Sequence, residues 1–305
     1  LAGGVALNCV ANGRVLREGP FDNIWIQPAA GDAGNALGCA LFAWHQLLDN
    51  PRTPDRRRQK ATYLGPEFRD EDIETYLKSI NAPYEKFGDE TLASRVAELL
   101  ATENVVGWFQ GRMEFGPRAL GARSILGDAR SREMQSVLNL KIKFRESFRP
   151  FAPAVLEERV SDYFELNTES PYMLLVADVT KEHLAPLDGD AAHATGFDML
   201  KVARSDVPAI THVDNSARIQ TVREEDHPRY YNLIKQFEKR TGCPVIINTS
   251  YNVRGEPIVC TPQEAYTCFM RTNMDYLVLG SCVLDKRNQP EWKDAVDWKK
   301  QYELD

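Results

Sequence analysis

The feature that most limits how this chain can fold is a basic segment from Arg112 to Pro153 in an otherwise acidic protein. Nine Lys or Arg residues and four Asp or Glu residues lie between Arg112 and Arg149, so the segment carries +5. The 305-residue chain has a formal net charge of −7, which leaves −12 for the remainder. Bulk attraction to nucleic acid would need a broadly positive surface. This local reversal of sign therefore predicts a pocket for a specific anion.

Gly and Pro residues separate the cations of this segment. They are expected to fix the backbone and therefore the directions in which the basic side chains point. Arg offers a planar fork that suits phosphate oxygens, and Lys offers a compact charge. If the chain is extended at Lys143 and Arg145, these two side chains share one face. The alternative is that the charges pair with surface acids elsewhere. The phosphate-binding candidates are Arg112, Arg118, Arg123, Lys141, Lys143, Arg145 and Arg149.

Length and composition are those of a soluble enzyme with one large domain or two smaller ones. No apolar run is long enough for a membrane helix and no basic-apolar leader is present, which predicts a cytoplasmic protein. The six cysteines stand singly, which favours reduced, buried thiols. The five histidines form no metal-binding pair, so a complete metal site within the chain is not expected.

Hydrophobic periodicity predicts an α/β fold in which strands alternate with helices. A capping box at Thr261, Pro262 and Glu264 marks the start of the last long helix. Asp70 is expected to cap the first helix after the linker. The expected strands cover 104–110, 172–178, 217–222, 244–248 and 275–279, and the expected helices start near 70, 90, 131, 229 and 262.

The first sixty residues differ from the rest in composition. Residues 1–8 are typical of an interior strand and glycine turn, which suggests that the chain is the C-terminal part of a longer protein. Residues 28–44 predict a tightly packed helix entered through a glycine-rich loop. Residues 50–60 are expected to be a linker, and 187–197 a loop.

A second polar motif follows the strand predicted at 244–248. Asn248, Ser250 and Asn252 would lie at the carboxyl end of that strand, where α/β proteins bind ligands. The alternative is that they are ordinary turn residues. His212, Asp214 and Arg218 are further candidates, although a strand histidine can also be a core residue with its hydrogen bonds satisfied.

These motifs together resemble a known family. Lys143 and Arg145 with Ser250 and Asn252 resemble the Lys-x-Arg and Ser-x-Asn pairs of YrdC-like domains, which bind ATP. More specifically, the segments 111–126, 148–155 and 211–222 resemble the NodU/CmcH/TobZ O-carbamoyltransferases, and the resemblance extends from residue 3 nearly to 285.

The resemblance implies an architecture as well as a reaction. Residues 1–60 would be the tail of an actin-like (ASKHA) domain plus a linker, and 61–305 a YrdC-like domain with a mixed twisted sheet. Asn8 would bind substrate or ATP, and Asp32 would be a ligand of Fe²⁺ in the intact protein. The histidines expected with Asp32 are absent from this chain.

The implied reaction has two steps. Carbamoyl phosphate and ATP, with Mg²⁺, give carbamoyl adenylate, and the carbamoyl group then passes to a hydroxyl of a sugar or natural-product acceptor in the other domain. Arg112, Arg118, Lys143 and Arg145 would be catalytic, and the other candidates would bind substrate or ATP. The alternative is a non-catalytic module for nucleotide or RNA, although the acidic remainder and the lack of aromatic residues among the cations argue against RNA.

Overall fold

The computed structural model describes residues 1–53, 59–186, 193–195, 198–199 and 202–294. Nine strands form one mixed sheet in the order β1-β9-β8-β2-β3-β7-β4-β6-β5. The pairs β2/β8 and β4/β6 are parallel and the other pairs are antiparallel. The strands are β1 (Glu85–Lys86), β2 (Val106–Phe109), β3 (Arg123–Asp128), β4 (Ala152–Leu156), β5 (Leu175–Asp178), β6 (Ser216–Val222), β7 (Val245–Ser250), β8 (Tyr276–Leu279) and β9 (Cys282–Asp285).

The helices begin and end at residues that suit helix termini. In α7, Pro228 occupies the first turn, and Gly242 ends the helix in the left-handed conformation (φ 78°). In α8, Thr261 and Glu264 form the capping box that the sequence predicts. The α-helices are α1 (Cys9–Glu18), α2 (Asp32–Phe42), α3 (Asp70–Ser79), α4 (Asp89–Ala101), α5 (Met134–Val137), α6 (Val160–Tyr163), α7 (Pro228–Thr241) and α8 (Pro262–Arg271). Within the described residues, no helix is long and apolar enough to cross a bilayer.

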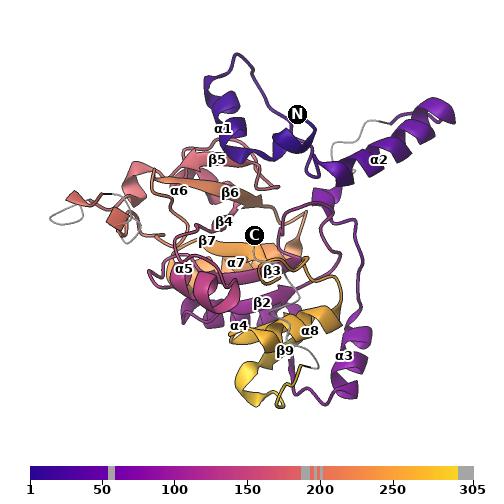
Figure 1. The fold of residues 1–305 in the computed structure, drawn as a ribbon, viewed down its shortest axis with the longest axis vertical. Helices are drawn as coiled ribbons and strands as arrows, with labels where there is room; N and C mark the ends of the chain where they lie inside the picture. Colours follow the sequence, from indigo (N-terminus) through magenta and orange to yellow (C-terminus); the bar gives the residue numbers. More distant parts are fainter. Residues whose placement is uncertain (54–58, 187–192, 196–197, 200–201, 295–305) are drawn as a thin grey trace.

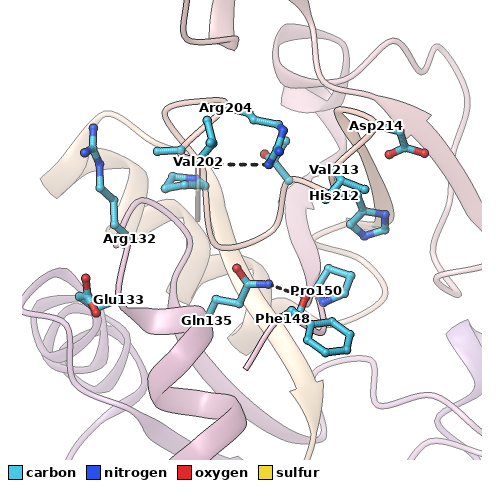
Figure 2. A pocket seen from close by; sticks show the side chains of 13 residues that line it. Arg132, Glu133, Gln135, Phe148, Pro150, Val202, Arg204, His212, Val213 and Asp214 are labelled. Atoms are coloured by element: carbon cyan, nitrogen blue, oxygen red, sulfur yellow. Dashed lines mark hydrogen bonds between the residues drawn. The ribbon is translucent and has the colours of Figure 1, made fainter. Parts of the chain in front are cut away.

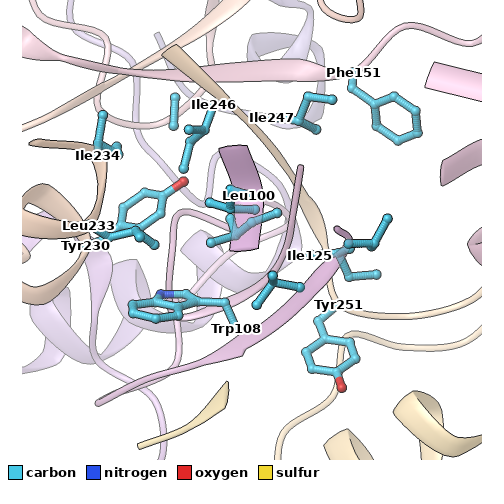
Figure 3. Packing of buried hydrophobic residues seen from close by; sticks show 14 of the residues in the cluster. Leu100, Trp108, Ile125, Phe151, Tyr230, Leu233, Ile234, Ile246, Ile247 and Tyr251 are labelled. Atoms are coloured by element: carbon cyan, nitrogen blue, oxygen red, sulfur yellow. The ribbon is translucent and has the colours of Figure 1, made fainter. Parts of the chain in front are cut away.

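The core lies on both faces of the central strands. On one face α4 and α7 pack together, and the buried Trp108 ring of β2 lies 6.5 Å from that of Tyr230 of α7. Figure 3 shows Ile246 of β7 in the same cluster. On the other face α8 packs against β2 and β8, and the Tyr251 hydroxyl donates to the Ala265 carbonyl at 2.7 Å. The α/β class with a mixed sheet is confirmed.

Strand pairing brings several distant loops to one edge of the sheet. Ser124 at the start of β3 pairs with Ser250 at the end of β7, and Ala152 at the start of β4 pairs with Asn248. Because β6 is parallel to β4, the start of β6 lies at this edge too. The loops before β3, β4 and β6 and the loop after β7 therefore meet there.

The predicted strands are confirmed, but β1, β3, β4 and β9 were not among them. Strand β3 lies inside the basic segment and β4 begins at its end, and there Arg123, Gly127 and Pro153 disguise the apolar alternation. The helix predicted from 131 is a short α5 followed by a π-helical turn at Leu138–Ile142.

Several expectations for chain segments are wrong. Residues 1–8 form a 3₁₀ turn (Gly4–Leu7) that leads into α1, not a strand. Helix α2 forms, but none of its residues is buried, and it extends away from the sheet (Figure 1). Asp70 is the first helical residue, and its carboxylate accepts from the Ser281 hydroxyl at 2.6 Å.

Other expectations are met only in part. All six cysteines are free, but Cys39 is exposed and only Cys243, Cys268 and Cys282 are buried. Parts of the predicted linker (54–58) and most of the predicted loop (187–192 and 196–197) lie outside the described residues.

Two glycines with positive φ give a matched test of this packing. A Cβ at Gly121 (φ 107°) would lie 2.4 Å from the Tyr230 ring, whereas a Cβ at Gly242 would meet nothing within 4 Å. We expect Gly121→Ala to lower the free energy of unfolding by roughly 2–4 kcal/mol, because overlap adds to backbone strain. Gly242→Ala should cost about 1 kcal/mol from strain alone. Urea unfolding measures both, and equal effects would contradict the close packing of Gly121 on Tyr230.

Candidate functional site

The loop between β2 and β3 is organised by one buried carboxylate. Glu114 is 6% exposed, and its Oε1 accepts backbone N–H groups of Leu120 at 2.6 Å, Ala122 at 2.7 Å and Arg123 at 3.2 Å. A carboxylate that collects several backbone donors offsets its own desolvation and fixes the backbone. The loop 114–123 is therefore held in one conformation.

Side chains from other elements hold the same loop from outside. Trp108 Nε1 donates to the Gly121 carbonyl at 2.8 Å, and the Tyr63 hydroxyl donates to the Leu120 carbonyl at 2.8 Å. Gln220 Nε2 on β6 also donates to the Leu120 carbonyl, at 2.7 Å. These bonds tie the loop that carries Arg118 to β2 and β6 of the sheet.

Three arginines converge beside this loop. Burial, followed by the positive charges of Arg118 and Arg145, lowers the pKa of Arg218 to about 10. Arg118 comes from the loop, Arg145 from the segment before β4, and Arg218 from β6. The Nε atom of Arg118 is buried and has no hydrogen-bond partner in the described structure. Neighbouring cations that are partly buried in this way are typical of an anion-binding site.

Lys143 lies at the edge of the same group. Its ammonium donates to Asn252 Oδ1 at 2.8 Å, to the Asn252 carbonyl at 2.9 Å and to Ser250 Oγ at 3.2 Å, and it also contacts the Ser250 carbonyl. Burial lowers its pKa to about 7, and the charge of Arg145 acts in the same direction. The structure thus brings Lys143 to Ser250 and Asn252, which lie more than a hundred residues after it in the sequence. We call Arg118, Lys143, Arg145 and Arg218 the cation cluster.

The expectation that Lys143 and Arg145 share one face of an extended segment is wrong. Lys143 has helical backbone angles and Phe144 has φ 48°, so the two side chains diverge. Arg145 Nε donates to Asn139 Oδ1 at 2.6 Å, and its guanidinium lies 5.0 Å from the centre of the Phe151 ring.

An acidic side chain lies at the outer rim of the cluster. Glu146 lies 3.0 Å from Arg149 Nε and 4.0 Å from an Arg254 nitrogen. The charges of Arg149 and Arg254 lower the pKa of Arg145 further, after burial. Arg149 therefore contributes positive charge at the solvent side.

Other predicted phosphate ligands are engaged elsewhere. Arg123 is fully buried, its guanidinium lies 3.5 Å from the centre of the Phe109 ring, and it donates to carbonyls that include those of Gln110 and Pro66. Arg112 is exposed and lies 3.5 Å from Glu67, and Lys141 is exposed on the π-helical turn. In this structure Arg123 supports the loop rather than faces the cluster.

The two N-terminal candidates have simple structural roles in the described residues. The Asn8 side chain caps α1 by accepting from Ala11 N at 3.1 Å. The next residue, Cys9, is close enough to Arg218 to raise the pKa of that arginine, so the start of α1 lies beside the cluster. Asp32 is exposed in the first turn of α2, and no group of three His, Cys, Asp or Glu side chains that could hold a metal exists in the described parts of the chain. Asp32 alone does not fit an iron site.

Asn248 lies deep on the sheet, at 1% exposure. Its Nδ2 donates to Gln220 Oε1 at 2.7 Å and to the Ala119 carbonyl at 3.4 Å. Its Oδ1 is buried without a partner in the described structure. Asn248 is thus next to the loop that carries Arg118, with one acceptor available.

His212 and Asp214 line a cavity of about 570 Å³ (Figure 2). Phe148 and Pro150 form part of its wall, and Gln135 Nε2 donates to the Phe148 carbonyl at 3.0 Å. Burial lowers the pKa of His212, and the charge of Arg218 lowers it further. The cavity and the cation cluster are therefore neighbours.

Sequence reasoning missed Glu114, Asn139 and Gln220 as contributors to the site. Glu114 counted only as a negative charge, although its position inside the glycine-rich part of the basic segment was a signal that it binds backbone N–H groups. Gln220 carries no local signal, because its partner Leu120 lies 100 residues away in the sequence. Asn139 bonds within its own segment, to Arg145 and to the carbonyls of Ser147 and Arg149, but no motif marks it.

Comparison with known proteins identifies the family to which the chain belongs. A model of the carbamoyltransferase C-terminus matches residues 97–286, which include the whole cation cluster, and a model of the carbamoyltransferase N-terminus matches residues 1–41. The chain belongs to the carbamoyltransferase family. The resemblance noted in the sequence is confirmed at the level of the family.

Relatives in this family are considerably longer. An uncharacterized protein of Synechocystis, sll1178, is 63% identical over 308 residues, which cover 100% of this chain and 50% of that protein. The nodulation protein NolNO of Sinorhizobium fredii is 41% identical over 305 residues, covering 98% of this chain and 41% of that protein. A full-length HypF structure matches 65% of this chain and 26% of its own with a TM-score of 0.40 and 18% identity, which is too distant to support an argument about the site.

The pKa of Lys143 predicts how anion binding depends on pH. Lys143 is charged below its pKa of about 7 and neutral above it. Sulfate does not titrate in this range, and we expect its affinity to fall by roughly tenfold between about pH 6 and pH 8.5. Calorimetric titration measures this.

The variant Lys143→Met should bind sulfate weakly at both pH values. Arg112→Met is the matched control, because Arg112 is exposed and paired with Glu67, and it should keep the wild-type dependence. Equal sulfate affinity of the wild-type chain at both pH values would contradict a role for the Lys143 charge.

Proposed function

We propose that this chain forms carbamoyl adenylate from carbamoyl phosphate and ATP, as part of an ATP-dependent O-carbamoyltransferase. The observation that carries the proposal is the cation cluster, in which Lys143 is bonded to Ser250 and Asn252 and the buried Nε of Arg118 has no partner in the described structure. Two phosphorylated substrates must be held together for this reaction, and their combined negative charge requires several cations. Membership of the carbamoyltransferase family supports the same conclusion.

The chemistry places few demands on protein nucleophiles. Water releases phosphate from carbamoyl phosphate, and an oxygen of the resulting carbamate attacks the α-phosphorus of ATP. The bond between the α-phosphorus and the bridging oxygen to the β-phosphate breaks, and pyrophosphate leaves. Arginines that hold the phosphates in line and oppose the developing charge would supply the catalysis. ATP would enter as its Mg²⁺ complex.

The neighbouring cavity is suited to the nucleoside of ATP. Its volume of about 570 Å³ lies within the range of small-molecule pockets. Phe148 and Pro150 offer flat apolar contacts for a base, and Asp214 and His212 offer partners for ribose hydroxyls. Lys143 would act on the phosphates through its charge, because its donors are occupied by Ser250 and Asn252.

Delivery to an acceptor belongs to the rest of the protein in this proposal. The chain spans half of the Synechocystis relative and less than half of NolNO. The acceptor would be a hydroxyl of a sugar or natural product, and any Fe²⁺ would be held mainly by residues outside this chain. Residues 1–60 would complete the other domain, and the exposed apolar side chains of Phe42 and Trp44 would pack on it. The whole protein would work in the cytoplasm.

The proposal is tested by pyrophosphate release from ATP. The purified chain with ATP and Mg²⁺ should release pyrophosphate only when carbamoyl phosphate is present. Arg118→Met and Arg145→Met should each lower the rate by roughly 100-fold, because each removes a charge that stabilises the transition state. Arg14→Met is the control, because Arg14 is exposed on α1 and paired with Glu18.

The outcome separates this function from its alternative. A wild-type chain that binds ATP but releases no pyrophosphate with carbamoyl phosphate would be a non-catalytic nucleotide-binding module. Wild-type rates in both arginine variants would show that the reaction takes place elsewhere in the chain.

A further inference from the structure

We propose that Asn248, held in one orientation by Gln220, selects the carbamoyl group by accepting a hydrogen bond from its NH₂. This inference rests on the proposed function, because it names the part of the substrate that one end of the site recognises. Gln220 is a positioning residue here, and Asn248 contacts the substrate.

The orientation of both amides is fixed by backbone carbonyls. Gln220 lies within 2.7 Å of the Leu120 carbonyl, and a carbonyl accepts only, so the NH₂ of Gln220 must face it. The oxygen of Gln220 must then face Asn248, which turns the Asn248 NH₂ toward Gln220 at 2.7 Å. The Ala119 carbonyl, at 3.4 Å from the same nitrogen, enforces the same choice. Asn248 therefore keeps its oxygen on the side away from Gln220 and the Ala119 carbonyl.

That oxygen is a buried acceptor without a partner in the described structure, on a residue that is only 1% exposed. Leaving such an atom unpaired is costly, so a ligand donor there is favoured. Arg118 carries the complementary atom, a buried Nε donor that also lacks a partner in the described residues. Asn248 bonds to the backbone of Ala119, the residue after Arg118. An unpaired acceptor and an unpaired donor thus belong to two residues that are linked through the backbone of Ala119.

A carbamoyl group has the matching pair of atoms. Its NH₂ donates, and its carbonyl oxygen accepts. The phosphate attached to it would face Arg145 and Arg218 of the cation cluster. Acetyl phosphate has nearly the same shape but carries a methyl group in place of the NH₂. It would leave Asn248 Oδ1 unpaired, and a site built around a hydrogen bond rejects such an analogue.

The experiment compares the affinities of the chain for carbamoyl phosphate, acetyl phosphate and inorganic phosphate by calorimetry. The wild-type chain should bind carbamoyl phosphate roughly 10- to 100-fold more tightly than acetyl phosphate. Gln220→Met should lower this ratio to within about threefold, because Asn248 is then free to rotate. Asn248→Leu should abolish it. Both variants should keep the wild-type affinity for inorganic phosphate.

The matched control is Gln236→Met. It removes an amide that pairs with Asn232 on α7, at 3.3 Å, away from the cluster. It should leave the ratio unchanged, and the inorganic phosphate affinity reports whether each variant is folded. If either site variant does not fold, the wild-type comparison of the two acyl phosphates decides the question.

The outcomes distinguish this inference from the proposed function. A wild-type chain that releases pyrophosphate with carbamoyl phosphate but binds both acyl phosphates equally would overturn the inference alone. Folded variants that keep the wild-type ratio would also overturn it. A chain that discriminates as expected but releases no pyrophosphate would overturn the proposed function and leave the selectivity standing.

Discussion

The carboxylate of Glu114 is the interaction on which the site depends. It gathers three backbone N–H groups of the loop 114–123, and this fixes the loop where Trp108, Tyr63 and Gln220 bind its carbonyls. Gly121 then sits against the Tyr230 ring, which packs on Trp108 in the core. The position of Arg118 is therefore set by the same contacts that stabilise the sheet and α7. The hydrogen bonds that position Arg118 for anion binding therefore also stabilise the core.

The cation cluster works against the stability of the empty protein. Burial and mutual repulsion both disfavour the charged forms of Lys143 and Arg218, as the lowered pKa values indicate. Two acceptors each from Ser250 and Asn252 offset part of the cost for Lys143. A bound anion would offset the repulsion between these cations. The unfavourable electrostatic free energy of the free chain would therefore favour the binding of phosphate groups.

Prediction from sequence succeeded where the signal was local. Apolar periodicity located α4 and α7, and the capping box located the start of α8. Prediction failed in β3, where charged and small residues interrupt the apolar alternation that marks a strand. It also failed at Phe144, where the positive φ of one residue decides the directions of the Lys143 and Arg145 side chains. The prediction that α2 is tightly packed was also wrong, because the sequence of an apolar helix does not show which surface it packs against.

The sequence by itself determined the segregation of charge, the residue types available for binding anions, and the family. These are properties of composition and of short motifs, which do not depend on distant contacts. Only the tertiary structure decided which cations converge: Arg118, Lys143, Arg145 and Arg218 meet, whereas Arg123 turns into the loop and Arg112 pairs at the surface. The physical reason is strand pairing over long separations, which places β3, β7, β4 and β6 side by side. The same pairing joins Gln220 to Asn248 and leaves the buried Asn248 oxygen without a partner in the described structure.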